Sequence, residues 1–206
     1  MISCVLLAAG LSSRMEGRNK LLMSLEGKTI LAHTLEALLA SDAGEVIVVL
    51  GYQSKEVQSF IDSKNYAVKT VYNKHFATGL TSSIKAGVKI TSSYSDGIMI
   101  CLADMPFIKP NQYNQIIKGF NQAVKSNPDT IIVPYYHGKW GNPVIFSAAH
   151  KSEILSHKKM EGCKGLIKSN PQNVIKINLS IKSITQDIDT QEEFESALQD
   201  NNNRHK

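Results

Sequence analysis

One short segment near the start of the chain, VLLAAGLSSRMEGRNKLL from Val5, combines small, hydroxyl and basic residues. Small residues let backbone N–H groups approach an anion closely, and serine hydroxyls add further donors. The pattern predicts a phosphate-binding loop; the alternative is a tight turn at Gly10 whose basic neighbours are solvated. The candidate nucleotide-binding residues of this segment are Leu7, Ala8, Ala9, Gly10, Ser12, Ser13, Arg14 and Lys20.

Two familiar phosphate-binding motifs are excluded by spacing. A dinucleotide fingerprint needs GxGxxG, but the next glycine after Gly10 is Gly17. A Walker A loop needs a glycine five residues before Gly27, and Leu22 stands there. The loop therefore has neither motif.

A carboxylate follows an apolar run in CLADMPF, residues 101–107. An acidic residue at the carboxyl end of a strand is a hard oxygen ligand for Mg²⁺, which also binds phosphate oxygens. Asp104 is thus a candidate metal ligand, with Pro106 stiffening the turn. The alternative is an aspartate that only caps a loop or starts a turn.

A third segment, GLTSSIKAG from Gly79, places hydroxyls at the start of an expected helix. Free N–H groups and the helix dipole favour bound anions there. Gly79, Ser82 and Ser83 are therefore candidate nucleotide contacts. The alternative is ordinary N-capping by Thr78 or Thr81.

The fourth segment is DIDTQEEF, which begins at Asp187. Asp187 and Asp189 share a face if the segment is extended, and Thr190 with Glu193 has capping-box spacing. One interpretation makes Asp189, and less surely Asp187, a second metal contact. The other places both charges at a helix N-terminus, which the dipole favours anyway.

The elements that must position these residues alternate between apolar and amphipathic stretches. Strand, helix, strand repeats predict a parallel sheet covered by helices on both faces, with ligands beyond the carboxyl ends of the strands. The fold class is thus α/β, a mostly parallel three-layer sandwich. The expected strands are 2–8, 45–50, 67–72, 97–102 and 130–134, and the expected helices are 29–40, 54–62, 80–91 and 110–125.

The pattern loosens after residue 134. YYHGKWGNPVIF predicts a turn and a short strand, antiparallel at the sheet edge. Short helices over 150–169, a strand over 173–178 and a helix over 190–199 complete a single domain of residues 1–199. The tail, 200–206, has no apolar anchor and is expected to fray.

Composition narrows the class of protein. The net charge is +5, but Lys and Arg are scattered, which suits an anionic small substrate better than nucleic acid. The three cysteines are far apart without CxxC spacing, so structural thiols are expected. No apolar run is long enough for a bilayer and no leader pattern is present, so we expect a cytoplasmic protein without membrane partners.

Five motifs in order, LLAAGLSSRM with a following lysine, GLTSSIKAG, LADMP, GNPVIF and DIDT, carry a family resemblance over residues 2–199. The sequence resembles the molybdenum cofactor cytidylyltransferases, among the Rossmann-like nucleotidyltransferases that also include the guanylyltransferases. The resemblance implies a nucleotide-diphospho-sugar transferase-like fold. It also implies that CTP and a molybdopterin-type phosphate are the substrates, with a molybdoenzyme or its chaperone as protein partner.

Site roles follow from the same resemblance. The first loop holds the triphosphate, with Lys20 and Arg14 as catalytic cations, and Asp104 with Asp189 binds Mg²⁺. Ala9 stands where guanylyltransferases carry glycine, which favours CTP over GTP. Glu16 interrupts the usual RMG pattern, and we expect it to face solvent.

The GNPV motif has asparagine where the family has histidine, so the acceptor pocket is expected to differ. Asn142 and Trp140 are candidate acceptor contacts; the alternative for Trp140 is packing of the GKWGNP turn. Positioning and charge neutralisation are what nucleotidyl transfer requires, and an ionised phosphate acceptor needs no general base. Two alternatives stay open. One is the same fold with another nucleotide or a sugar or polyol phosphate acceptor; the other is a non-catalytic nucleotide-binding protein that delivers cofactor.

Overall fold

The computed structural model describes residues 1–15, 17–158, 160 and 162–202. Most expected elements are present, with boundaries within about three residues. The strands are β1 (Ile2–Ala8), β2 (Ser24–Leu25), β3 (Lys28–Thr29), β4 (Glu45–Leu50), β5 (Lys69–Tyr72), β6 (Gly97–Leu102), β7 (Ile131–Tyr136), β8 (Lys139–Trp140), β9 (Val144–Ser147) and β10 (Val174–Asn178). The α-helices are α1 (Ile30–Leu39), α2 (Ser54–Ser63), α3 (Leu80–Lys89), α4 (Pro110–Ala123), α5 (Lys151–Ser156), α6 (Cys163–Ser169) and α7 (Gln191–Asn202).

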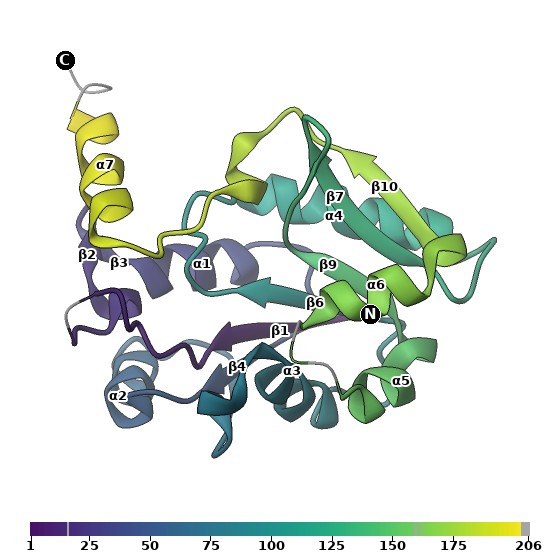
Figure 1. Cartoon of the computed structure of the whole chain (residues 1–206), viewed down its shortest axis with the longest axis horizontal. Coiled ribbons are helices and arrows are strands. Elements are labelled where there is room, and N and C mark those ends of the chain that lie inside the picture. The colour runs from purple at the N-terminus through teal and green to yellow at the C-terminus, as the bar shows by residue number, and fades with distance from the viewer. Residues whose placement is uncertain (16, 159, 161, 203–206) are drawn as a thin grey trace.

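The main sheet has the strand order β10-β7-β9-β6-β1-β4-β5, with β8 paired to β7. β1 lies parallel to both β4 and β6, so the first half of the fold is the parallel arrangement that the alternating pattern predicted. Helices cover both faces of the sheet, and Figure 1 shows α3, α5 and α6 on one side with α1 and α4 on the other. The predicted three-layer α/β architecture is confirmed.

Two apolar cores lie on the two faces of the sheet. Along β1, alternate side chains enter one core or the other: Leu6 packs with α1, whereas Val5 packs with α3. Both side chains are fully buried. Because both faces are covered, the strand is a continuous apolar run rather than an alternating one. In the described part of the chain, no helix is both long and apolar enough to cross a membrane.

One expectation about topology is wrong. The short strand after residue 134 is β9, and it is antiparallel as expected, but it lies inside the sheet between β6 and β7 rather than at an edge. All four of its residues are buried, which an edge strand does not require. Its apolar residues Val144, Ile145 and Phe146 fill this central position.

Two smaller differences concern short or terminal segments. The β2–β3 hairpin was not predicted, because two-residue strands carry no usable periodicity. The last helix, α7, continues to Asn202, so residues 200–202 of the expected frayed tail are helical. The remaining tail, 203–206, lies outside the described residues.

The strand order fixes where a ligand can bind. From β1 the chain adds β4 and β5 on one side, and then β6 on the other side of β1. The order therefore reverses between β1 and β6, where Leu7 and Leu102 are paired near the strand ends. In open α/β sheets, such a reversal opens a crevice at the carboxyl ends of the strands.

Candidate active site

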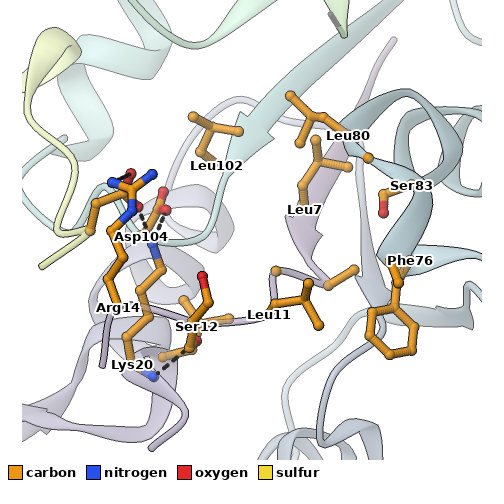
Figure 2. A pocket seen from close by; sticks show the side chains of 17 residues that line it. Leu7, Leu11, Ser12, Arg14, Lys20, Phe76, Leu80, Ser83, Leu102 and Asp104 are labelled. Carbon is orange, nitrogen blue, oxygen red and sulfur yellow. Dashed lines mark hydrogen bonds and ion pairs between the residues drawn. The ribbon is translucent and has the colours of Figure 1, made fainter. Parts of the chain in front are cut away.

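A cavity of about 310 Å³ lies at this reversal point. Figure 2 shows two sides to it: Arg14, Lys20 and Asp104 gather on one side, and Leu7, Leu80 and Phe76 lie on the other. The lining residues are Leu7, Ala9, Gly10, Leu11, Ser12, Ser13, Arg14, Lys20, Leu21, Phe76, Ala77, Gly79, Leu80, Ser83, Leu102, Asp104 and Asp189.

The loop after β1 presents its backbone to this cavity. Within the described part of the chain, the N–H groups of residues 10–14 donate to no acceptor. Ser12 has a φ of 51°, a left-handed conformation that is typical of backbone anion nests. Its hydroxyl accepts a 3.3 Å hydrogen bond from the N–H of Lys20, and the side chain of Met15 is anchored in the core. The loop is thus held in place while its donors stay free.

Lys20 joins two carboxylates that are distant in sequence. Its Nζ lies 2.5 Å from Asp104 Oδ2 and 2.5 Å from Asp189 Oδ1. Arg14 Nη1 is 3.4 Å from the other oxygen of Asp189. The Lys20 side chain is 10% exposed, whereas that of Arg14 is 67% exposed. The predicted basic and acidic residues therefore form one network, with Lys20 at its centre.

Main-chain hydrogen bonds position both carboxylates. Ala103 donates its N–H to Leu7 O at 3.2 Å, and the buried hydroxyl of Thr34 donates to Ala103 O at 3.1 Å. The N–H of Ile188 donates to Asp104 O at 3.0 Å, which ties the DIDT segment to the end of β6. The two acidic motifs are therefore fastened together by backbone as well as through Lys20.

The start of α7 explains how Asp189 is presented. Glu193 Oε2 accepts from the N–H groups of Asp189 and Thr190 at 2.7 and 2.9 Å, and Thr190 Oγ1 accepts from the N–H of Glu193 at 3.2 Å. This is the predicted capping box. The two interpretations of DIDT are compatible, because Asp189 precedes a capped helix and still turns its side chain toward Lys20.

Charge around the network shifts two pKa values. Burial alone would lower the pKa of Lys20, but Asp104 and Asp189 outweigh it, so the pKa lies above its ordinary value. Asp187 is an exposed residue outside the cavity lining; partial desolvation, followed by the neighbouring carboxylates Asp104 and Asp189, raises its pKa. Asp189 is therefore the better placed of the DIDT pair.

Asp104 keeps one unused acceptor. Its Oδ1 is buried and has no hydrogen-bond partner in the part of the chain that the structure describes. A buried carboxylate oxygen without a donor is unfavourable unless another cation or donor approaches it. Among the described residues, no group of three or more His, Cys, Asp or Glu side chains forms a metal cluster. Two carboxylates beside a loop with unpaired N–H groups do fit Mg²⁺, which commonly takes one or two carboxylates plus substrate oxygens.

The segment before α3 contributes in part. Gly79 and Ser83 line the cavity, but Ser82 does not, since its Oγ accepts from Asn73 and donates to backbone carbonyls. The capping alternative is wrong, because no described side chain caps α3 and Thr78 donates to the carbonyl of His75 instead.

Ala8 also stays outside the lining, because its side chain enters the core that contains α1. Trp140 packs edge-on against Tyr135 with ring centroids 6.2 Å apart, and the N–H of Asn142 donates to Ile184 O at 2.8 Å. Neither Trp140 nor Asn142 lines this cavity. Glu16, expected to face solvent, lies outside the described residues.

Sequence reasoning missed the apolar half of the cavity. Its members share no motif; they come from the first loop, the short 3-10 turn Lys20–Leu22, the segment before α3, the first residue of α3 and the end of β6. Phe76, three residues before Gly79, was the one available signal, since an aromatic residue beside a phosphate loop suits a flat ring. The missed residues are Leu11, Leu21, Phe76, Ala77, Leu80 and Leu102.

Comparison with known proteins identifies the class of this chain. Residues 4–174 match the model of the MobA-like NTP transferase domain family. The chain belongs to this family of nucleotidyltransferases, which confirms the resemblance seen in the motifs.

Individual relatives of known name have low sequence identity to this chain. The chain is 26% identical over 197 residues to the molybdenum cofactor cytidylyltransferase of Escherichia coli, covering 95% of each. It is 24% identical over 205 residues to the nicotine blue oxidoreductase of Paenarthrobacter nicotinovorans, covering 96% of each. The crystal structure of Rv0371c from Mycobacterium tuberculosis superposes with a TM-score of 0.81 and 24% identity, covering 96% of this chain and 97% of that one.

Proposed function

We propose that this nucleotidyltransferase moves CMP from CTP to a phosphate acceptor of the molybdopterin type and releases pyrophosphate. The observation that carries the proposal is the network of Lys20 with Asp104 and Asp189, set against five consecutive N–H groups in the loop after β1 that have no acceptor among the described residues. Donors for a triphosphate and oxygens for a divalent cation thereby face one cavity.

The chain's own residues supply positioning and charge. The N–H groups of residues 10–14 bind phosphate oxygens, and Arg14, which is exposed at the rim, adds a mobile guanidinium. Lys20 turns from the carboxylates toward the triphosphate and neutralises charge as the acceptor attacks the α-phosphate. Asp104 and Asp189 hold Mg²⁺, which when bound screens the phosphate oxygens and stabilises the leaving pyrophosphate.

The apolar half of the cavity accounts for the nucleoside. Phe76 and Leu80 lie across the cavity from Lys20 and Asp104, so a triphosphate on the charged side directs its base toward them (Figure 2). Ala9 lies in the same lining and is 4% exposed. Guanylyltransferases carry glycine at this position, and we attribute the preference for the smaller pyrimidine to this difference.

A pyrophosphate-release assay tests the proposal. The purified chain is incubated with Mg²⁺ and each of four nucleoside triphosphates, with and without molybdopterin. We expect release from CTP that depends on molybdopterin. Asp62→Ala, at an exposed position on α2, is the control for substitutions of the active-site aspartates and should retain the full rate.

Other outcomes point elsewhere. Release with a sugar or polyol phosphate, but not with molybdopterin, would overturn the acceptor. CTP binding by calorimetry without release with any acceptor would instead indicate a cofactor-delivery protein. Turnover of nicotine blue would instead support the activity in the name of the Paenarthrobacter relative.

Ala9→Gly tests the base preference. The substitution gives this position the residue of the guanylyltransferases, so we expect the ratio of kcat/KM for CTP to that for GTP to fall by about 10-fold, the lower end of the roughly 10-fold to 200-fold range of one methylene. Ala77→Gly, a substitution of the same kind elsewhere in the lining, is the comparison. An unchanged ratio in Ala9→Gly would show that Ala9 does not determine the selectivity for CTP.

A further inference from the structure

A second cavity, of about 370 Å³, lies next to the loop that follows Asp104. Its lining shares no residue with the first cavity. It is enclosed by the β2–β3 hairpin, α1, the start of α4, the segment before α7 and α7 itself. The lining residues are Leu25, Glu26, His33, Pro106, Phe107, Lys109, Gln112, Ile181, Lys182, Ser183, Gln186 and Ala197.

Gln112 and Ser183 are buried polar residues of this lining, 8% and 7% exposed. Gln112 Oε1 accepts from the N–H of Lys109 at 2.8 Å and from the hydroxyl of Ser183 at 3.0 Å. These two donors fix the orientation of the amide. Nε2 has no acceptor among the described residues and reaches solvent, so an accessible amide donor is available in the cavity lining.

The charges around Gln112 favour an anion. Lys109 and Lys182 both line the cavity, and neither forms an ion pair in the described part of the chain. Glu26 is the single carboxylate of the described lining. His33 is already engaged, with Nε2 2.7 Å from Leu25 O. Two free ammonium groups and an amide donor therefore outweigh one carboxylate.

The remainder of the lining is apolar. Phe107, Ile181 and Leu25 provide ring and aliphatic surface beside the polar groups. The volume falls in the range of about 300–1,000 Å³ that is typical of small-molecule pockets. We propose that this cavity binds a small molecule carrying a phosphate or carboxylate on an apolar or aromatic body, with Gln112, Lys109 and Lys182 as its anion contacts.

The second cavity lies beside the chain segments that carry the active-site carboxylates. Pro106 and Phe107 follow Asp104 directly along the chain, and Gln186 precedes the DIDT segment. The N–H of Ile188 donates to Asp104 O, so a backbone hydrogen bond joins the loop after β6 to the DIDT segment. Occupancy of the second cavity therefore restrains the segments that position Asp104 and Asp189.

Phenyl phosphate is the probe, measured by calorimetry on the nucleotide-free chain. We expect it to bind the wild type more tightly than inorganic phosphate, which lacks an apolar body. Lys109→Met with Lys182→Met should weaken binding at least tenfold. The matched pair Lys118→Met with Lys125→Met removes equal charge from exposed positions near and on α4, and should leave binding unchanged.

Gln112→Glu provides the sharper variant. It keeps the acceptor for Lys109 and Ser183 and replaces the free donor by a charged oxygen, so binding should be lost while the cooperative melt is retained. Lys20→Met, which alters only the first cavity, should not change the affinity. Equal affinity in Gln112→Glu and wild type, or loss of affinity in Lys20→Met, would overturn the proposal, whatever the outcome of the pyrophosphate assay.

Discussion

Two acidic groups lie at opposite ends of the central strands, and their surroundings differ. Glu45 begins β4 at the end of the sheet where β1 also begins, and Asp104 follows β6 at the end where β1 finishes. The Glu45 side chain is 12% exposed and that of Asp104 is 18% exposed. Burial is thus nearly equal, and the hydrogen bonds make the difference.

The network around Glu45 is closed. Its carboxylate accepts from Lys69 Nζ at 2.8 Å, from the N–H of Ser92 at 2.7 Å and from the hydroxyl of Ser3. The network around Asp104 is open, because Oδ1 has no partner among the described residues. A closed network stabilises the fold, whereas an open one retains capacity for a ligand.

The largest expected effect is that of Asp104→Asn. Removing one of the two carboxylates that we propose to hold Mg²⁺ should lower kcat/KM for pyrophosphate release by roughly 10²–10³, as loss of a preorganised electrostatic contact does in other enzymes. The cooperative melt should persist. Retained activity would show that the open network has no catalytic role and would undo the comparison.

Glu45→Gln should show the reverse pattern. The substituted amide still accepts from Ser92 but turns a donor toward Lys69, so we expect the free energy of unfolding to fall by about 1–3 kcal/mol. Turnover should be unchanged at a temperature where both proteins are folded. Urea denaturation followed by circular dichroism measures the stability, with Glu56→Gln on the surface of α2 as the control.

The stabilities of wild type and Glu45→Gln should also differ in their dependence on pH. Burial alone would raise the pKa of Glu45, but the hydrogen bonds from Lys69, Ser3 and Ser92 outweigh it and lower the pKa below its ordinary value of 4.5. A lowered pKa adds stability above pH 4.5 that is lost as the pH falls through the folded-state pKa. The stability difference between wild type and Glu45→Gln should therefore be constant from pH 7 to 5 and shrink below 4.5. A difference that does not shrink as the pH is lowered below 4.5 would contradict this expectation.

Much of this arrangement was predictable from sequence, for physical reasons. Apolar runs marked the strands, and the rule for parallel sheets brought Gly10 and Asp104 to one edge. The position of β9 was not predictable from its local pattern, because strand order depends on pairing with residues far away in the chain. The apolar half of the first cavity was missed because Phe76 and Leu80 look like ordinary core residues until the fold aligns them. The second cavity was not predicted because its residues come from five separate segments of the sequence.

The smallest expected effect concerns Lys20, which neutralises the open network in the nucleotide-free chain. In Lys20→Met the carboxylates of Asp104 and Asp189 lose their shared cation, so Mg²⁺ alone should raise the melting temperature of this variant more than that of wild type. At tenfold its dissociation constant, a ligand that binds only the folded state adds about 1.4 kcal/mol. Differential scanning calorimetry with 0 and excess Mg²⁺ measures the shift, and Lys20→Met combined with Asp104→Asn should abolish it. An equal shift in all three proteins would mean that Mg²⁺ binds elsewhere. The open network around Asp104 would then bind a cation no better than the closed network around Glu45.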